Sequence, residues 1–201
     1  MIYLLLVVRT IRRGKAMEGN KVYLLLTDTG TIFTRMIKLY TKKPYNHASI
    51  VFDENFIEVY SFGRKRPRNP FIGGFVNEDV RQGLFKNARC AIYSFSATDQ
   101  QVSKMKTFIK EIEMEKHLYR YNLIGLITFI LNKPYERERA YFCSEFVAQV
   151  LNEGGISQFQ KPISLVSPND LRNMKNFQLE FEGELADLLA SETSTRVYPA
   201  I

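Results

Sequence analysis

Two short apolar runs in the first third of the chain constrain its fold more than any other feature. They are NHASIVF at 46–52 and FIEVYSF at 56–62, and only the three residues DEN separate them. Runs of this length that are rich in β-branched and aromatic residues predict strands, and a short polar break predicts that the strands form a hairpin. The DEN turn is not of the strongest hairpin type. Three further segments, VYLLLT, FIGGFVNEDV and ARCAIYSFS, also favour strands.

Helical patterns follow these strands. SATDQQ at 96–101 predicts a helix start, since Thr98 can cap it and Gln101 completes a capping box. That helix should extend to about His117 with an apolar face. The more hydrophobic YNLIGLITFILNKP at 121–134 suits a buried core helix. A third helix should begin near Cys143 and end at a glycine of NEGG, and VSPNDL predicts a turn and a short helix. Antiparallel strands followed by helices indicate an α+β fold.

The length and composition are those of one globular domain. The chain has 201 residues, of which 45% are hydrophobic and 24% are charged. We expect residues 1–201 to form a single domain with a core at about 22–175. The segments 1–16 and 180–201 should be peripheral. The sequence sets no oligomeric state.

The N-terminus carries an apolar run, Ile2–Val8, that is too short to span a bilayer. Its basic residues follow the run instead of preceding it, which argues against a secretory signal. Two interpretations stay open: a first strand, or a true start at Met17. With only two cysteines and no metal-like Cys/His spacing, we expect reduced thiols, a cytoplasmic location, and neither a metal nor a cofactor.

The net charge of +7 is moderate. It suits an acidic partner, such as nucleic acid, a membrane surface or a carboxylate-bearing substrate, or simply a solvated basic surface. The densest basic cluster, GRKRPRNP at 63–70, has the composition of a loop. Because zinc-finger spacing, an RNA-binding aromatic signature and a long basic arm are all missing from the sequence, nucleic-acid binding is not expected.

The candidates for chemistry are few because the chain has only two histidines. His117 lies at a predicted helix end, where it can interact with free carbonyls and the helix dipole. His47 opens an apolar strand, where a polar ring must be hydrogen-bonded or functional. Cys143 stands at a predicted helix start, which favours the reactive thiolate, although free cysteines are also commonly buried core residues. Cys90 lies in a predicted strand and should be packing.

Glu58 is the candidate third group, which would orient the imidazole. Its carboxylate interrupts the apolar FIEVY run, which is costly without a partner. A tight turn at DEN pairs Glu58 with Ile50 or Val51, however, several residues from His47. Contact would then need strong twist, a bulge or a different orienting group. An exposed strand position is the alternative interpretation of Glu58.

These residues resemble a known family. YNHASIVFDENFIEVYS followed much later by YFCSEFVAQVL is similar to the circularly permuted branch of the NlpC/P60 papain-like superfamily, which includes YiiX-like, poxvirus-type and lecithin retinol acyltransferase proteins. In that branch the histidine strand precedes the cysteine helix. YRYNLIGL and the SPNDL turn also resemble YiiX-like members. The resemblance covers about residues 22–175, and the order and spacing of its motifs are more specific than any one motif.

The resemblance implies a permuted papain-like fold, with an antiparallel sheet or small barrel packed against helices. It implies a thiol hydrolase or acyltransferase in which Cys143 attacks a carbonyl carbon, His47 transfers protons and Glu58 fixes the imidazole. The expected substrate is a small peptide, such as a murein-type or γ-glutamyl amide. Lipid acyl chemistry with peripheral membrane contact is the alternative within the fold, and a non-catalytic binding module is the alternative outside it. Tyr45 would line the cleft, and Arg64 and Arg66 would contact a substrate carboxylate.

Overall fold

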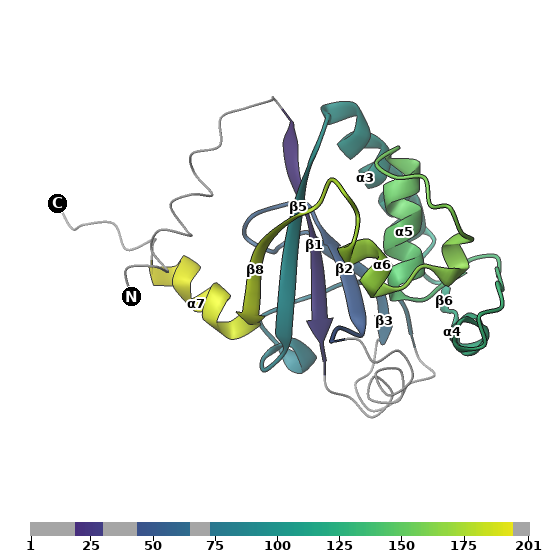
Figure 1. Cartoon of the computed structure of the whole chain (residues 1–201), viewed down its shortest axis with the longest axis horizontal. Helices are drawn as coiled ribbons and strands as arrows, with labels where there is room; N and C mark the ends of the chain where they lie inside the picture. The colour runs from purple at the N-terminus through teal and green to yellow at the C-terminus, as the bar shows by residue number, and fades with distance from the viewer. Residues whose placement is uncertain (1–18, 30–43, 65–72, 195–201) are drawn as a thin grey trace.

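A computed structural model describes residues 19–29, 44–64 and 73–194 of the chain. Its centre is a six-stranded antiparallel sheet with the strand order β4-β3-β2-β1-β5-β8 (Figure 1). A separate parallel pair joins β6 to β7. The strands of the large sheet are β1 (Asn20–Asp28), β2 (His47–Val51), β3 (Val59–Arg64), β4 (Gly73–Asn77), β5 (Arg89–Ala97) and β8 (Gln178–Glu184), and the pair is β6 (Arg120–Tyr121) and β7 (Ala140–Tyr141).

The part of the chain that the structure describes contains five α-helices and two 3₁₀ turns. They are α3 (Asp99–Met114), α4 (Leu123–Ile130), α5 (Cys143–Glu153), α6 (Pro168–Arg172), α7 (Leu185–Ser194), η1 (Gly83–Phe85) and η2 (Ile163–Leu165). Five strands of the large sheet, β1 to β5, precede the helices α3 to α6, and β8 follows them. The α+β class predicted from the sequence is therefore confirmed.

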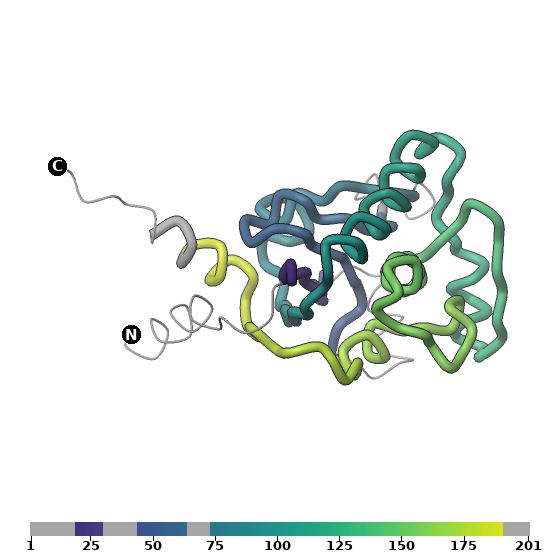
Figure 2. The backbone as a smooth tube through the Cα atoms, turned by 90° about the horizontal axis from the view of Figure 1, so that it is seen from above, coloured from purple at the N-terminus to yellow at the C-terminus, as the bar shows by residue number. Residues whose placement is uncertain are grey.

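The two faces of the sheet bury different side chains. On one face Leu24 and Leu26 of β1 belong to the larger core cluster, which includes residues of α3 and α5. On the other face Tyr23 and Leu25 join a smaller cluster with Leu185 of α7. This alternation follows from the period of two along a strand. The view from above shows the same arrangement, with the green segments that contain α5 on one side of the sheet and the yellow α7 on the other (Figure 2).

The hairpin predicted from NHASIVF and FIEVYSF is confirmed. Strands β2 and β3 pair antiparallel, with Ile50 opposite Tyr60 and Val51 opposite Val59. Asp53 holds the turn, because its carboxylate accepts hydrogen bonds from the backbone N–H groups of Asn55, Ile57 and Glu58. Phe56 in the same turn has a φ of 55°, the left-handed conformation that favours glycine, and the Asp53 hydrogen bonds hold the backbone on both sides of it.

The start of α3 and the end of α5 lie where the sequence predicts them. The Thr98–Gln101 capping box opens α3, although the helix ends at Met114 and not near His117. Met105, Ile109 and Ile112 form its buried face. At the end of α5, Gly155 has a φ of 64°, the left-handed conformation that favours glycine.

The segment 121–134 differs from its prediction as a buried core helix. Helix α4 has only eight residues, and Ile124 and Ile127 are 49% and 54% exposed. It lies away from the sheet, against η2 and the start of α5, and its buried positions are only Gly125 and Leu126. Among the described residues, no helix has the length and apolar character needed to span a membrane.

The core also extends further toward the C-terminus than predicted. Residues 178–184 form β8, which pairs with β5 and places Phe181 opposite Ile92. Leu185 of α7 is fully buried. β8 is an edge strand of the sheet and contains no buried residue, so of residues 178–185 only Leu185, which follows it, is buried in the smaller core cluster. Residues 1–16 lie outside the described part.

Candidate active site

The start of β2 and the start of α5 meet at one end of the sheet. His47 is the first residue of β2 and Cys143 is the first residue of α5. The Cys143 sulfur lies 4.0 Å from the backbone oxygen of Asn46, which directly precedes the histidine. The predicted pair of Cys143 and His47 is therefore brought together across 96 residues of chain. Both cysteines of the protein are free thiols.

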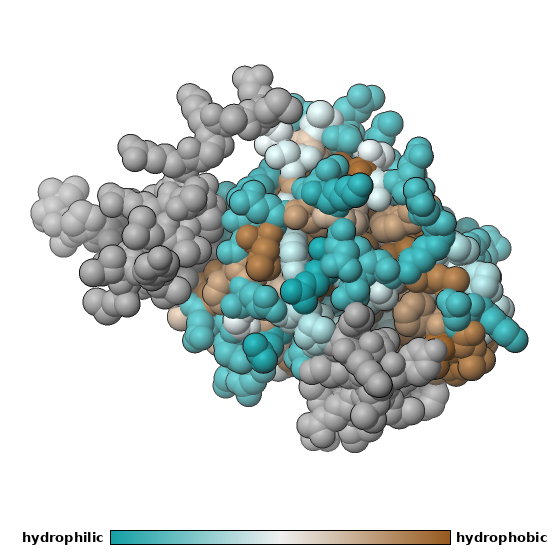
Figure 3. All heavy atoms as spheres, viewed as in Figure 1, coloured by the Kyte–Doolittle hydropathy of each residue, from teal (hydrophilic) through white to brown (hydrophobic). Residues whose placement is uncertain are grey.

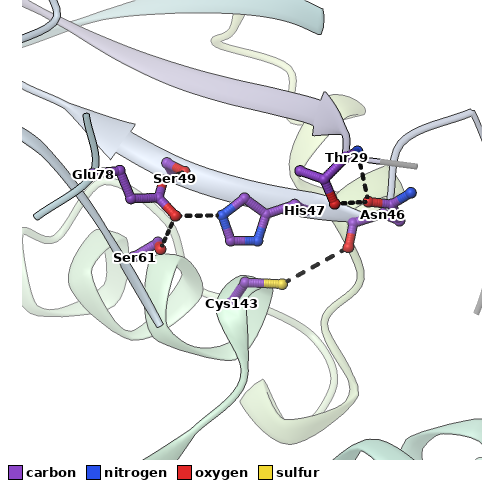
Figure 4. Close-up of polar contacts among 7 residues, drawn as sticks. All are labelled: Thr29, Asn46, His47, Ser49, Ser61, Glu78 and Cys143. Atoms are coloured by element: carbon purple, nitrogen blue, oxygen red, sulfur yellow. Dashed lines mark hydrogen bonds and ion pairs between the residues drawn. The ribbon is translucent and has the colours of Figure 1, made fainter. Parts of the chain in front are cut away.

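The imidazole ring of His47 lies between an acidic group and the thiol (Figure 4). Its Nε2 is 2.8 Å from Oε1 of Glu78. The other ring nitrogen, Nδ1, is on the side of the ring that faces Cys143. Phe85 of η1 packs beside the ring, with a centroid separation of 6.1 Å. The arrangement has the order of a nucleophile, a base and an orienting carboxylate.

Glu78 follows β4 and is held in place by both backbone and side-chain contacts. Its N–H donates to the carbonyl of Val59 at 2.7 Å. The hydroxyls of Ser49 and Ser61 donate to its two carboxylate oxygens at 2.5 and 2.7 Å. The Glu78 side chain is only 8% exposed and that of His47 only 12%. Such a fully hydrogen-bonded carboxylate can remain charged although it is buried.

Glu58 does not orient His47, and the prediction that it does is wrong. Its carboxylate forms an ion pair with Lys106 of α3 at 2.6 Å, and both side chains are more than one third exposed. The hairpin register explains the difference, because the carbonyl of Glu58 accepts from the N–H of Phe52, at the far end of β2 from His47. Glu58 shares its strand parity with Tyr60, on the face that packs against the helices. Ser61, which contacts Glu78, has the opposite parity.

The pair of His47 and Glu78 is a buried ion pair. Burial by itself would lower the pKa of His47, but the charge of Glu78 and hydrogen bonds to Cys143 and Glu78 raise it to about 10. Burial acts to raise the pKa of Glu78, and the charge of His47 with hydrogen bonds from His47, Ser49 and Ser61 outweighs it, so that pKa is lowered. Both shifts favour an imidazolium beside a carboxylate at neutral pH.

The first turn of α5 is fixed on both sides of the cysteine. Phe142 is buried, and its N–H donates to the Glu145 carboxylate at 3.1 Å. The hydroxyl of Ser144 donates to the carbonyl of Val166 at 2.7 Å. Burial raises the pKa of Glu145 to about 7, although hydrogen bonds from Phe142 and Asn122 oppose this. The residues on either side of Cys143 are thus held by hydrogen bonds.

The backbone of this turn supplies a donor for a developing negative charge. Because Cys143 is the first helical residue, its N–H has no carbonyl acceptor within the helix. A backbone N–H at a helix start, beside a nucleophile, is suited to bind an oxyanion. Cys90 has no comparable setting. It is fully buried in β5, and burial together with the charge of Glu184 raises its pKa to about 12.

Asn46 sets the position of the backbone between the two reactive residues. Its side-chain oxygen accepts from the N–H and hydroxyl of Thr29, both at 3.4 Å, and its amide donates to Asp28 at 2.6 Å. These contacts fix the end of β1 to the start of β2, where Thr27 pairs with His47. Asn46 thereby keeps its carbonyl against the thiol (Figure 4).

The predicted substrate-binding residues have different outcomes. Tyr45 is buried and lies with Pro168 and Arg172 at a shallow depression of the surface that has no room for a water molecule, so no substrate cleft is formed there. Its hydroxyl donates to Glu182 at 2.6 Å. Arg64 ends β3, where its backbone pairs with Gly73. The side chain of Arg64 and all of Arg66 lie outside the described residues.

A metal site is not evident in the part of the chain that the structure describes. No group of three or more His, Cys, Asp or Glu side chains there is arranged to hold an ion.

Comparison with protein-family models, with curated proteins and with solved structures finds no match to the chain. The functional interpretation therefore depends on the geometry of the site.

The sequence contained one signal for Glu78 that the prediction did not use. Ser49 and Ser61 interrupt two apolar strands, and both are fully buried. Buried hydroxyls need acceptors, and two of them at matching parity on neighbouring strands indicate a shared one. FVNEDV places an acidic residue at the end of the next strand, which pairs with β3. An acceptor at Glu78 could have been inferred from this pattern.

Proposed function

We propose that the protein is a cysteine-dependent acyl hydrolase with a permuted papain-like arrangement, in which Cys143, His47 and Glu78 act together. The position of the His47 imidazole between the Glu78 carboxylate and the Cys143 thiol carries this proposal. A structural ion pair alone would not need a thiol beside it at a helix start. The substrate class that the family resemblance favours is a small amide or peptide.

In the proposed reaction, the Cys143 thiolate forms a bond to the substrate's carbonyl carbon. The carbonyl π electrons move to oxygen, where the Cys143 N–H stabilises the negative charge. The bond to the leaving amine then breaks, and the His47 imidazolium donates its proton to the departing nitrogen. Water next attacks the thioester while the neutral imidazole accepts its proton. The acid product leaves, the thiolate forms again, and Glu78 holds the ring throughout.

Selective thiol labelling tests the proposed nucleophile. With a limiting amount of iodoacetamide at pH 7, Cys143 should be modified and Cys90 should not, because Cys90 is buried and its pKa is raised to about 12. In a His47→Ala variant the labelling of Cys143 should slow by at least about tenfold, since the imidazolium no longer stabilises the thiolate. Peptide mass spectrometry after timed quenching measures both sites.

His117→Ala is the matched control for this experiment, because His117 is the other histidine and is exposed. Labelling at its parent rate is expected there. Equal and slow modification of both cysteines, or no response to His47→Ala, would contradict a reactive pair and would favour a binding module that keeps the fold.

Hydrolysis assays distinguish the two substrate classes. Short peptide amides, including γ-glutamyl amides, should be cleaved, and Cys143→Ala should reduce the rate to background because the thioester cannot form. Acyl-lipid esters are the second candidate class, which the exposed apolar side of α4 beside the α5 start favours. Chromatographic detection of the released acid measures both reactions. Cleavage that persists in Cys143→Ala would rule out the thiol mechanism.

A further inference from the structure

The exposed side of α4 carries apolar side chains that the core does not use. Ile124, Ile127 and Leu131 are 49%, 54% and 61% exposed. Their spacing of three and four residues places them along one side of the helix. These three residues are called the α4 patch below. Apolar side chains gather at the end of the molecule where α4 lies in Figure 1 (Figure 3).

Basic residues accompany the α4 patch. The connecting segment 115–139, between α3 and β7, contains five Lys or Arg and three Asp or Glu residues, a net charge of +2 with His neutral. Within it, Arg139 forms an ion pair with Glu115 at 3.5 Å. Lys133 follows the end of α4, and Arg137 lies further along the same segment, near β7; both are exposed, as are the acidic Glu136 and Glu138 on either side of Arg137. Tyr135, an aromatic residue that favours membrane interfaces, is 38% exposed in the same turn.

The opposite side of α4 connects it to the candidate active site. The ring of Phe129 packs on Phe142, directly before the cysteine, at a centroid distance of 5.8 Å. Asn122 caps α4 by accepting from the Gly125 N–H at 2.9 Å, and its amide donates to Glu145 of α5 at 3.4 Å. A surface that contacted the α4 patch would therefore lie next to the start of α5.

From these contacts we infer that the α4 patch docks on an anionic lipid bilayer surface. Partial insertion of three large aliphatic side chains with basic residues beside them is the combination by which short helices bind such surfaces. A second copy fits less well. A symmetric contact would bring two segments of charge +2 together. A helix of eight residues, about 12 Å long, also offers far less than the roughly 800 Å² that each partner of a stable complex buries.

Vesicle co-sedimentation of the full chain tests this inference. The protein should bind vesicles of mixed phosphatidylcholine and phosphatidylserine, and weakly or not at all those of phosphatidylcholine alone. Ile124→Ser with Ile127→Ser should weaken binding at least about tenfold through lost apolar insertion. Lys133→Gln with Arg137→Gln should weaken it about tenfold, and added salt should weaken the parent.

Matched controls use the same residue types elsewhere. Ile57 is 67% exposed in the β2–β3 turn, so Ile57→Ser should leave binding unchanged. Lys104→Gln with Lys110→Gln, on the exposed side of α3, should weaken binding clearly less than the pair beside α4. Because all these side chains are exposed, thermal unfolding should be close to that of the parent and confirms that each variant folds.

Three results would overturn the inference. The first is no binding to anionic vesicles. The second is a loss of binding in Ile57→Ser equal to that in Ile124→Ser with Ile127→Ser. The third is a protein that does not bind vesicles but forms a concentration-dependent dimer, which Ile127→Ser dissociates. The measurement is of binding only, so its failure would leave the proposed hydrolase untouched. Likewise, an inactive Cys143→Ala variant should bind vesicles as the parent does.

Discussion

Glu78→Gln is expected to lower the rate of the proposed hydrolysis by about 10²–10⁴-fold while keeping the size of the side chain. The amide can still contact the imidazole, but it removes the negative charge 2.8 Å from Nε2. We expect the buried ring then to lose its proton, because burial lowers its pKa and only the contribution of Cys143 is left to oppose this. A neutral imidazole neither stabilises the thiolate nor protonates the leaving amine. The rate of iodoacetamide labelling at Cys143 gives a second measurement that needs no substrate.

The same substitution should destabilise the fold. Breaking a buried ion pair by removing one charge costs about 3–5 kcal/mol, and the hydroxyls of Ser49 and Ser61 lose a charged acceptor at the same time. Urea unfolding at pH 7 measures the change in the free energy of unfolding. Labelling must therefore be carried out well below the unfolding midpoint of the variant.

Glu58→Gln is the control, since Glu58 was the carboxylate that the sequence suggested. Its ion pair with Lys106 is more than one third exposed on both sides. Exposed pairs contribute about 0–1 kcal/mol, so stability and labelling should both stay close to the parent. A variant of Glu58 that lost reactivity while Glu78→Gln kept it would show that the carboxylate assigned from the geometry is the wrong one.

The contrast between these two carboxylates shows where sequence reasoning ended. The hairpin, the α3 cap and the glycine end of α5 depend on neighbouring residues, and their patterns were sufficient. The pairing of Cys143 with His47 followed from residue scarcity and from the order of strand and helix. The third residue depended on how β4 pairs with β3 and on which face each strand residue occupies. A register error of one residue reverses that face.

Helix α4 shows a second limit of sequence reasoning. LIGLITFI is apolar on every side, which predicts burial. The sheet is already covered by α3 and α5, which pack Met105, Ile109 and Phe146 into the larger cluster. The position left for α4 beside the start of α5 buries only one side of an eight-residue helix. Hydrophobicity could not distinguish a core helix from an exposed apolar one, because the difference depends on which helices already occupy the sheet.

The protonation of His47 gives the second large effect. In the parent protein the imidazolium should persist through neutral pH and lose its proton only near pH 10, because the charge of Glu78 and the hydrogen bonds to Cys143 and Glu78 raise its pKa against the effect of burial. NMR titration of the ring Cε1–H signal measures this directly. Only two histidines contribute signals, and a His117→Gln variant assigns them. In Glu78→Gln the same signal should titrate below the ordinary value of about 6.5.

Stability should follow the same protonation with a definite sign. A raised pKa in the folded state means that the contribution of His47 is complete below about pH 6.5 and is lost as pH rises toward 10. The lowered pKa of Glu78 acts at the other end: its contribution is present above about pH 4.5 and is lost as pH falls through the folded value. The free energy of unfolding of the parent, measured with urea, should therefore be lower at pH 9 than at pH 6. That difference should shrink in Glu78→Gln, where the charge of Glu78 no longer raises the pKa of the ring.

A parent signal that titrates near pH 6.5 would contradict the ion pair. The carboxylate would then orient a neutral ring by hydrogen bonding alone, and the thiol would need the imidazole as a base in each turnover. A signal that stays protonated to high pH in both the parent and Glu78→Gln would instead assign the raised pKa to Cys143, the other group that raises it. Repeating the titration in Cys143→Ala separates these cases, because an ion pair held mainly by Glu78 keeps most of its raised pKa when the thiol is removed.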